Sequence, residues 1–419
     1  MGVPAELPPV SGAPARIAIV RARYNPFGGA ERFVQRALGA LAARGVEVTV
    51  IARRWPRSPP AAGEFAPRMV RVDPFYVGSV WRDWSFARAV RRLLARESFS
   101  VVQSHERIPG VAVYRAGDGV HATFLEQRRR AVPRWRAWAL RANPYHAYVL
   151  ATERAMFTDP ALRAVICNSS MVRDDIRKRF GVPAERLHVI RNGVDLERFR
   201  PPSDAERADA RRALGLAGAT TAFVFVGSGF ERKGLAAAIR AVARLAGERD
   251  VQLLAAGSDR RAASYRRLAA SLGVAGRVRL LGGVQDVVPM LWAADAFVLP
   301  TLYDPFPNAA LEALACGLPV VTSTGSGASE LVRDGVNGWV VDALDLEALA
   351  GAMRRLCEPG ARAAMSGPAR GSVQALSLDA LAGQLLALYG QLLADVRSSP
   401  LAPGATPGRT PPPAEPTAP

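Results

Sequence analysis

The stretch TAFVFVGSGFERKGL, residues 221–235, joins an apolar run to a Gly/Ser turn that two cations follow. Such a run predicts a buried strand of a parallel sheet, with a helix after the turn. Open parallel sheets bind ligands at the carboxyl ends of their strands. The candidate anion-binding residues here are Gly227, Ser228, Arg232 and Lys233. Backbone amides at a helix start and two cations attract phosphate, although an exposed basic turn without a ligand is the alternative.

The composition fits two globular domains with a strong positive charge. The 419 residues are 49% hydrophobic and 22% charged, which is enough to form two cores. The formal charge of +18 favours an anionic partner such as a nucleotide, a nucleic acid or an acidic lipid. Almost all cations are Arg, so a GC-rich genome explains the charge equally well. Lys233 stands out because Lys178 is the only other lysine in the sequence.

The cysteines and the apolar segments indicate where the protein is found. Cys167, Cys316 and Cys357 lie far apart and form no metal-binding spacing, which favours a reducing compartment and no bound metal. The first residues lack the basic and apolar regions of a signal peptide. No apolar stretch approaches the roughly 20 residues that cross a bilayer. We expect a cytoplasmic protein that can lie on the inner face of the cytoplasmic membrane.

Short apolar runs alternate with helical patterns in two separate parts of the chain. The first part begins with RIAIVRA (16–22), a helical pattern over 30–45 and VEVTVIA (46–52). The second part begins with TAFVFVG (221–227) and continues to GWVVD (338–342). This alternation predicts an α/β fold of two Rossmann-like domains, each with an open parallel sheet. The predicted boundaries are residues 15–200, residues 201–376, a closing helix over 377–396 and a disordered Pro-rich tail over 397–419.

Two further loops carry residues suited to ligand binding. Gly28 and Gly29 follow the first predicted strand, where glycines let a ligand approach the backbone closely or simply form a tight turn. Asp304 and Glu312 lie eight residues apart, in a loop and on the helix after it, where each can accept hydrogen bonds from ligand hydroxyls or cap the helix. One glycine loop in each domain suggests a ligand held between two facing sheets.

Residues 124–141 combine six arginines with Trp135 and Trp138. A basic and aromatic segment favours an anionic membrane surface or a phosphorylated acceptor. A solvated helix with half-buried tryptophans is the alternative. We expect no nucleic acid partner, because the sequence has no helix-turn-helix, zinc or RNP signature.

Four segments resemble, in order and spacing, the donor-binding half of the retaining family-four glycosyltransferases, which have the GT-B fold. The similarity spans residues 185–345. The first half is similar to the subgroup that contains lipopolysaccharide core glucosyltransferase I. The four segments are FVGSGFERKG, RVRLLGGVQDVVPMLWAADAFVLPT, YDPFPNAALEALACGLPVVTS and GASELVRDGVNGWVV.

The resemblance implies an enzyme that transfers a hexose, with retention, from a nucleotide diphosphate sugar such as a UDP-sugar. The second domain would bind the donor, and the first would present a saccharide acceptor of a lipid-linked or envelope glycan such as lipopolysaccharide core. No cofactor is implied, and the sequence lacks the DxD pair that clamps a metal and a diphosphate. The leaving diphosphate would take the acceptor's proton.

The resemblance also assigns roles to residues. Arg232 and Lys233 would stabilise the diphosphate, Asp304 the sugar hydroxyls and Glu312 the ribose. The remaining implied donor contacts are Gly28 and Gly29 over the phosphates, Gly282, Gly283 and Val284 at the base, Asp118 and His121 at the sugar, and the loop residues Phe306, Pro307 and Asn308.

Asp304 departs from the family, which usually has Glu at this place, so the identity of the sugar stays open. Three other functions also stay open at this point. They are a sugar-nucleotide epimerase of the same fold, a phosphorylase, which would need a pyridoxal phosphate lysine, and a basic nucleic-acid- or membrane-binding module without catalysis.

Overall fold

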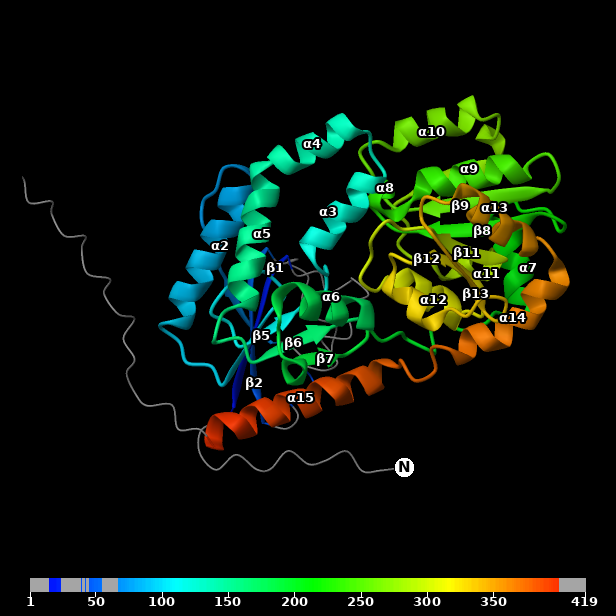
Figure 1. The fold of residues 1–419 in the computed structure, drawn as a ribbon. Helices are drawn as coiled ribbons and strands as arrows, with labels where there is room; N and C mark the ends of the chain where they lie inside the picture. Colours follow the sequence, from blue (N-terminus) through cyan, green and yellow to red (C-terminus); the bar gives the residue numbers. More distant parts are fainter. Residues whose placement is uncertain (1–14, 24–38, 40–41, 43–44, 55–66, 399–419) are drawn as a thin grey trace, which may run out of the picture.

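The computed structural model describes residues 15–23, 39, 42, 45–54 and 67–398 (Figure 1). Gly28, Gly29, most of the helix predicted over 30–45 and the tail after Ser398 lie outside these residues.

The first domain contains a seven-stranded parallel sheet in the order β3-β2-β1-β4-β5-β6-β7. The chain starts in the middle of this sheet and extends it in both directions, so the topology reverses between β1 and β4. The strands are β1 (Arg16–Arg23), β2 (Glu47–Arg54), β3 (Arg68–Arg71), β4 (Val101–Ser104), β5 (Val113–Arg115), β6 (Ala164–Cys167) and β7 (Leu187–Val189).

The second domain contains a six-stranded parallel sheet with the same doubly wound plan, in the order β10-β9-β8-β11-β12-β13. Its topology reverses between β8 and β11. The strands are β8 (Thr221–Val226), β9 (Val251–Ala256), β10 (Val278–Gly282), β11 (Ala296–Leu299), β12 (Val320–Ser323) and β13 (Gly338–Val341). The predicted fold class is confirmed, and ligands of such sheets bind at the reversal points.

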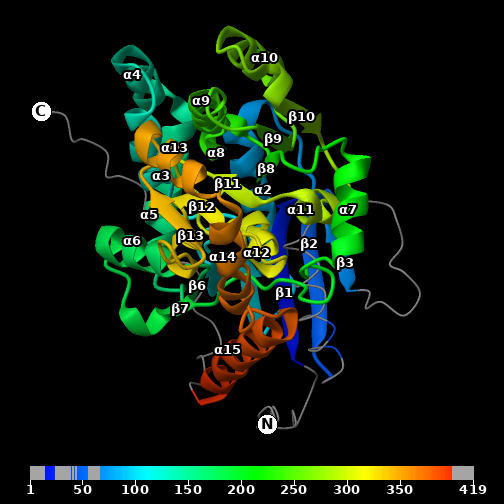
Figure 2. The same ribbon diagram turned by 90° about the vertical axis from the view of Figure 1, so that its right-hand side faces the viewer.

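Helices cover both sheets (Figures 1 and 2). Those of the first part are α2 (Gly78–Leu94), α3 (His121–Arg130), α4 (Arg134–Ala142), α5 (Pro144–Phe157), α6 (Ser170–Phe180) and the short η1 (Ala184–Arg186). Those of the second part are α7 (Asp204–Ala213), α8 (Phe230–Lys233), α9 (Leu235–Leu245), α10 (Ala262–Ser271), η2 (Ala275–Arg277), α11 (Val288–Ala293), α12 (Asn308–Ala315), η3 (Gly327–Leu331), α13 (Leu346–Arg355), α14 (Pro359–Gly371) and α15 (Leu378–Ser398).

The central strands are apolar along almost their whole length because helices cover both faces of each sheet. Phe223, Phe225 and Phe297 are fully buried in the second core, and Ile17 is fully buried in the first. This is why the strands could be found as uninterrupted apolar runs rather than as alternating patterns.

The C-terminal helix α15 returns to the first domain. Leu381, Leu385 and Tyr389 pack in one core with Ile19 of β1, and the Tyr389 hydroxyl donates to Gln103 Oε1 at 2.6 Å. Figures 1 and 2 both show α15 beyond the second domain, alongside the first sheet. The predicted closing helix therefore exists, and its contacts join the two domains.

Candidate active site

The short helix α8 places two cations at the reversal point of the second sheet. Gly229 and Gly234 flank it with φ angles of 74° and 81°, a left-handed backbone that favours glycine. A Cβ atom at Gly234 would lie 1.9 Å from the Pro300 carbonyl oxygen, so only glycine fits there. The Arg232 carbonyl accepts hydrogen bonds from the Leu302 amide (2.8 Å) and the Thr301 hydroxyl (2.9 Å). These contacts fix α8 against the loop that follows β11.

The sequence places Arg232 and Lys233 near the start of one helix, and the structure divides that helix in two. Both cations lie at the end of the four-residue α8, directly before α9 begins at Leu235. The prediction of cations near a helix start therefore holds for α9.

Arg232, Lys233 and Asp304 come together although 71 residues separate the lysine from the carboxylate. The Lys233 ammonium donates to Asp304 Oδ2, and Arg232 Nη1 lies 3.5 Å from the same oxygen. Arg232 Nη1 also donates to the Tyr303 carbonyl at 3.0 Å. The side chains of Lys233 and Asp304 are only 12% and 8% exposed, whereas that of Arg232 is 37% exposed. The three predicted catalytic residues thus form one cluster with a single exposed cation.

Burial and the Asp304 carboxylate act in opposite directions on Lys233. Burial lowers the pKa of the Lys233 ammonium, Asp304 raises it, and Arg232 lowers it further. Burial is the largest of these effects and the pKa is lowered overall, while the carboxylate limits the fall.

Gly227 and Ser228 border this cluster as predicted. A Cβ atom at Gly227 would lie 3.2 Å from the Lys233 Cε atom, so the missing side chain leaves room for the lysine stem. The Ser228 hydroxyl accepts a hydrogen bond from the Ser258 amide at 3.1 Å. The turn is therefore tied to the strand end of β9 as well as to α8.

One loop of the first domain contacts the Asp304 loop directly. The Val120 amide donates to the Tyr303 hydroxyl at 2.8 Å, and a Cβ atom at Gly119 would lie 2.2 Å from that hydroxyl. Gly119 also has a φ angle of 67°. The two domains thus meet beside the cluster, through the loop of Gly119 and Val120 rather than through the predicted loop of Gly28 and Gly29, which lies outside the described residues.

Glu330 joins the domains a second time. Its carboxylate accepts from the Met171 amide at 2.9 Å and from Arg191 Nη2 at 2.6 Å. Glu330 lies in the Gly-rich turn STGSGASE (323–330), and Arg191 lies two residues after the end of β7.

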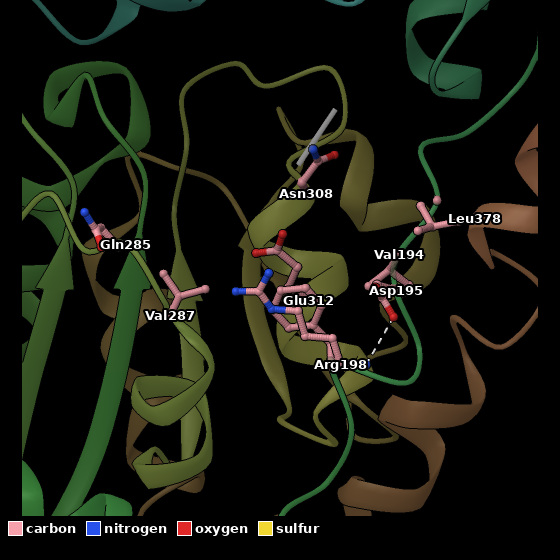
Figure 3. Close-up of a pocket in the computed structure, with 10 residues that line it drawn as sticks. Val194, Asp195, Arg198, Gln285, Val287, Asn308, Glu312 and Leu378 are labelled. Carbon is pink, nitrogen blue, oxygen red and sulfur yellow. Dashed lines mark hydrogen bonds between the residues drawn. The ribbon is translucent and has the colours of Figure 1, made fainter. Parts of the chain in front are cut away.

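Glu312 and Asn308 lie apart from the lysine cluster, in a pocket of about 210 Å³ (Figure 3). Glu312 is on the second turn of α12, as predicted. Figure 3 shows Gln285 and Val287 on one side of Glu312 and Asp195 on the other. The Asn308 side-chain oxygen accepts from Asn192 at 2.7 Å. A carboxylate, amides and apolar walls can hold a polar ring, so this pocket suits the nucleoside end of a donor.

The other predicted donor contacts lie in the loop after β10 and in the loop before α12. Gly282 ends β10 with its carbonyl accepting from the Gly257 amide at 2.7 Å, and Gly283 and Val284 are exposed beyond it, next to Gln285. Phe306 and Pro307 are buried, and the Phe306 ring belongs to the core. Those two residues therefore shape the loop, and their side chains are not available to a ligand.

His121 begins α3 and is held by a buried carboxylate. Both oxygens of Glu153, which is 0% exposed, accept from the His121 amide at 3.1 Å, and Arg107 Nε donates to the same carboxylate at 3.0 Å. His121 Nε2 lies 3.0 Å from His146 Nδ1. Burial lowers the pKa of His121 to about 4, with Arg107 and His146 contributing, so the ring is neutral at pH 7. Asp118 does not accompany it but lines a pocket of the first domain.

The basic segment 124–141 forms α3 and α4. Trp135 and Trp138 on α4 are 67% and 72% exposed, so they are less buried than the alternative of a solvated helix with half-buried tryptophans assumes. Two arginines of α3 form ion pairs with the second domain. Arg128 Nε lies 3.3 Å from Glu231 Oε1, and Arg130 Nη2 lies 2.6 Å from Asp342 Oδ2. Among the described residues, no helix is long and apolar enough to cross a membrane.

Family models match both domains. The model described as Glycosyltransferase Family 4 covers residues 27–198, and the model described as Glycosyl transferases group 1 covers residues 220–359. The D-inositol 3-phosphate glycosyltransferase of Actinosynnema mirum is 31% identical over 414 residues, which are 90% of this chain and 97% of that protein. The chain is a family-four glycosyltransferase. The recognition made from its sequence is confirmed.

Other glycosyltransferases share its sequence and its fold. The lipopolysaccharide glucosyltransferase WaaG of Escherichia coli K12 is 26% identical and covers 78% of this chain and 84% of its own. A crystal structure of WaaG superposes with a TM-score of 0.76 at 24% identity over 89% of this glycosyltransferase and 99% of that chain. Anabaena HepE, solved with UDP and glucose, gives a TM-score of 0.68 at 19% identity over 90% and 100% of the two chains. These structures confirm the GT-B fold.

Several site residues of this glycosyltransferase could not be found from the sequence. Nothing in the local sequence distinguishes Tyr303 from other aromatic residues, and Glu153 lies within an unremarkable helical pattern. Arg107 and Arg191 resemble dozens of other arginines in this composition. Only long-range contacts distinguish them.

Proposed function

We propose that this glycosyltransferase moves a hexose, with retention and without a metal, from a nucleotide diphosphate sugar to a saccharide acceptor. A UDP-sugar is the simplest donor, since the Anabaena neighbour was solved with UDP and glucose. The acceptor belongs to a lipid-linked or envelope glycan, as the name of the lipopolysaccharide relative suggests. The name of the Actinosynnema mirum relative adds a phosphorylated polyol to these acceptor classes.

The Arg232, Lys233 and Asp304 cluster carries this proposal. It lies where the second sheet reverses and where the first domain makes contact through Tyr303. Transfer of a sugar leaves negative charge on the departing diphosphate, and preorganised cations stabilise such charge without help from a metal. The sequence offers no DxD pair for a metal clamp. Arg232 is the exposed cation that a diphosphate meets first, and Lys233 lies behind it.

Retention follows from the way the acceptor reaches the donor. The leaving diphosphate can take the acceptor's proton on the face where the new bond forms, so no carboxylate is required as a base. Asp304 is then left to accept hydrogen bonds from the sugar, and Glu312 from the ribose. His121, neutral at pH 7, can donate or accept at the sugar without adding charge.

Binding of intact donors tests this function. Purified protein is incubated with UDP-, GDP- and ADP-sugars, and thermal unfolding and slow donor hydrolysis are followed. A donor at 100 times its Kd should stabilise the protein by about 2.7 kcal/mol. Lys178→Met is the matched control for Lys233→Met. It removes the same charge, but from a lysine that is exposed on α6. Absence of stabilisation and hydrolysis with every donor would contradict the proposal and favour a binding module without catalysis.

The same proposal includes an anionic membrane surface at residues 124–141. Trp135 and Trp138 are exposed on α4 beside Arg134, Arg136 and Arg141. Exposed tryptophans flanked by arginines insert at the lipid headgroups. Such docking would bring the first domain to a lipid-linked acceptor.

A further inference from the structure

The segment of residues 119–121 lies between the core of the first domain and the Lys233 cluster. Its middle amide donates to the Tyr303 hydroxyl at 2.8 Å, and Tyr303 directly precedes Asp304, the partner of Lys233. Its last residue, His121, begins α3. A displacement of this segment would therefore move the His121 ring relative to a sugar held at the cluster.

Two side chains of the first domain bond to each other and to this segment. Arg107 Nε donates to Glu153 Oε1 at 3.0 Å, and Arg107 Nη2 donates to the Gly119 carbonyl at 3.2 Å. Both oxygens of Glu153 accept from the His121 amide at 3.1 Å. The pair thus contacts the first residue of the segment through its carbonyl and the last residue through its amide.

Helix α5 contacts His121 at two points. His146 and Glu153 lie seven residues apart on the buried face of α5, so they point to the same side of the helix. Glu153 accepts from the His121 amide, and His146 Nδ1 lies 3.0 Å from His121 Nε2. One helix therefore fixes both the backbone and the ring of His121.

The burial of Glu153 is not explained by stability alone. Glu153 is 0% exposed. Burial raises the pKa of its carboxyl, and Arg107 and the His121 amide oppose that rise. Replacing a buried ion pair by apolar residues of similar volume is often neutral or stabilising, because desolvation offsets the attraction between the charges. What apolar residues could not supply are the hydrogen bonds to the segment 119–121.

We infer that Glu153 is a positioning residue, which holds His121 at the place beside the donor sugar that transfer requires. Arg107 shares this role, because it links Glu153 to the Gly119 carbonyl. The inference rests on the proposed function, since it adds residues to the site of the same reaction. Neither side chain has to touch the sugar, because each acts through the segment 119–121.

Two substitutions at position 153 separate the reach of the side chain from its charge. Glu153→Asp keeps the carboxylate that Arg107 requires and shortens the side chain by one methylene. Glu153→Gln keeps the length and removes the charge. A displacement of about 1 Å can cost on the order of 10²-fold in rate, so we expect transfer at saturating donor to fall at least about 10-fold in both variants. The Kd for UDP should stay unchanged, because UDP carries no sugar for His121 to contact.

Asp295→Asn is the matched control. Asp295 is a buried carboxylate that likewise accepts from a backbone amide, that of Ala222 at 2.8 Å, and from an arginine, Arg207 Nη2 at 2.7 Å. It directly precedes β11, at the amino-terminal edge of the second sheet, whereas α8 follows the carboxyl end of β8. Under conditions in which every variant is folded, this control should keep its transfer rate. An equal loss of transfer in Asp295→Asn, or no loss in the Glu153 variants, would overturn the inference.

Imidazole spectra give a readout that needs no donor. The sequence contains four histidines, so each ring can be assigned by substitution in nitrogen-15 spectra. In Glu153→Asp we expect the ring signals of His121 and His146 to shift and those of His105 and His188 to stay. An unchanged His121 ring would show that Glu153 does not position it.

A double-variant cycle decides whether Glu153 acts through His121. Transfer is measured for His121→Ala, for Glu153→Asp and for both together. If the carboxylate acts through the ring, the double variant should be no slower than His121→Ala alone, whereas full multiplication of the two losses would refute the inference. A wild type that neither transfers nor hydrolyses any donor rejects the proposed function and this inference with it. An active wild type whose Glu153 variants match Asp295→Asn rejects this inference alone.

Discussion

Lys233→Met separates the chemistry of the candidate site from its packing. Methionine keeps an unbranched buried side chain and removes the charge. The Lys233 side chain is only 12% exposed and its ammonium pairs with Asp304, so a cation from the solvent cannot take its place in the variant. If Lys233 stabilises the departing diphosphate, transfer should fall by about 10² to 10³, the loss typical of one donor to transition-state charge.

The same substitution should also lower the free energy of unfolding. Asp304, 8% exposed, would keep only Arg232, whose Nη1 lies 3.5 Å from its Oδ2 atom. Removing one partner of a buried ion pair typically costs about 3–5 kcal/mol, and the remaining arginine should hold the loss near the lower value. The double variant Lys233→Met with Asp304→Asn removes both charges. It should regain most of the stability and none of the transfer.

Two assays decide the matter. Transfer is measured at saturating donor, and the free energy of unfolding is measured in urea, for each single variant, the double variant and the control Lys178→Met. Wild-type turnover in Lys233→Met would remove the lysine from the chemistry. Recovery of turnover together with stability in the double variant would show that the pair serves folding alone.

Three further predictions concern the donor, the membrane and pH. Asp304→Glu should change the ranking of nucleotide sugars, because a displacement of about 1 Å can cost on the order of 10² in rate; an unaltered ranking over a donor panel would count against contact with the sugar. Replacing Trp135 and Trp138 by alanine should weaken cosedimentation with anionic vesicles by about 10-fold or more, and unchanged binding would leave α4 a solvated helix. Burial lowers the pKa of His121 to about 4 and also lowers that of His146. Between about pH 6.5 and pH 4 the unfolded chain therefore binds more protons than the folded protein, so the free energy of unfolding should fall as the pH is lowered through this range. In His146→Gln the urea midpoints should fall less steeply.

The fold was predictable wherever a strand is buried on both faces. Runs such as TAFVFVG contain no charged residue that would suggest a loop, and this one forms the strand β8. The strand RMVR of β3 ends in arginines, and LHV of β7 has three residues, so neither gives a pattern that stands out from a loop. The apolar face of α15 predicted a helix, but only tertiary packing decides that this helix lies against Ile19 of the first sheet.

The sequence predicted which residues belong to the site, but not which of them contact one another. Glycines and cations after a strand identified Arg232 and Lys233, and the spacing of two carboxylates identified Asp304 and Glu312. No local pattern shows that Asp304 pairs with Lys233 while Glu312 lies in a separate pocket. That difference arises from the hydrogen bonds that the Leu302 amide and the Thr301 hydroxyl donate to the Arg232 carbonyl, which join α8 to the loop after β11 across about 70 positions.

The pairing also bears on why lysine rather than arginine stands at position 233. The Lys233 side chain runs past Gly227, where a Cβ atom would lie 3.2 Å from Lys233 Cε. This space suits an unbranched chain better than a planar guanidinium. In the free protein burial lowers the pKa of Lys233, and Asp304 opposes that effect. A compact ammonium can turn toward an arriving diphosphate, and the carboxylate that it leaves is then free to accept sugar hydroxyls. Diphosphate binding by Lys233 and sugar binding by Asp304 would thus be coupled. On donor binding, Lys233 would exchange the Asp304 carboxylate for the diphosphate.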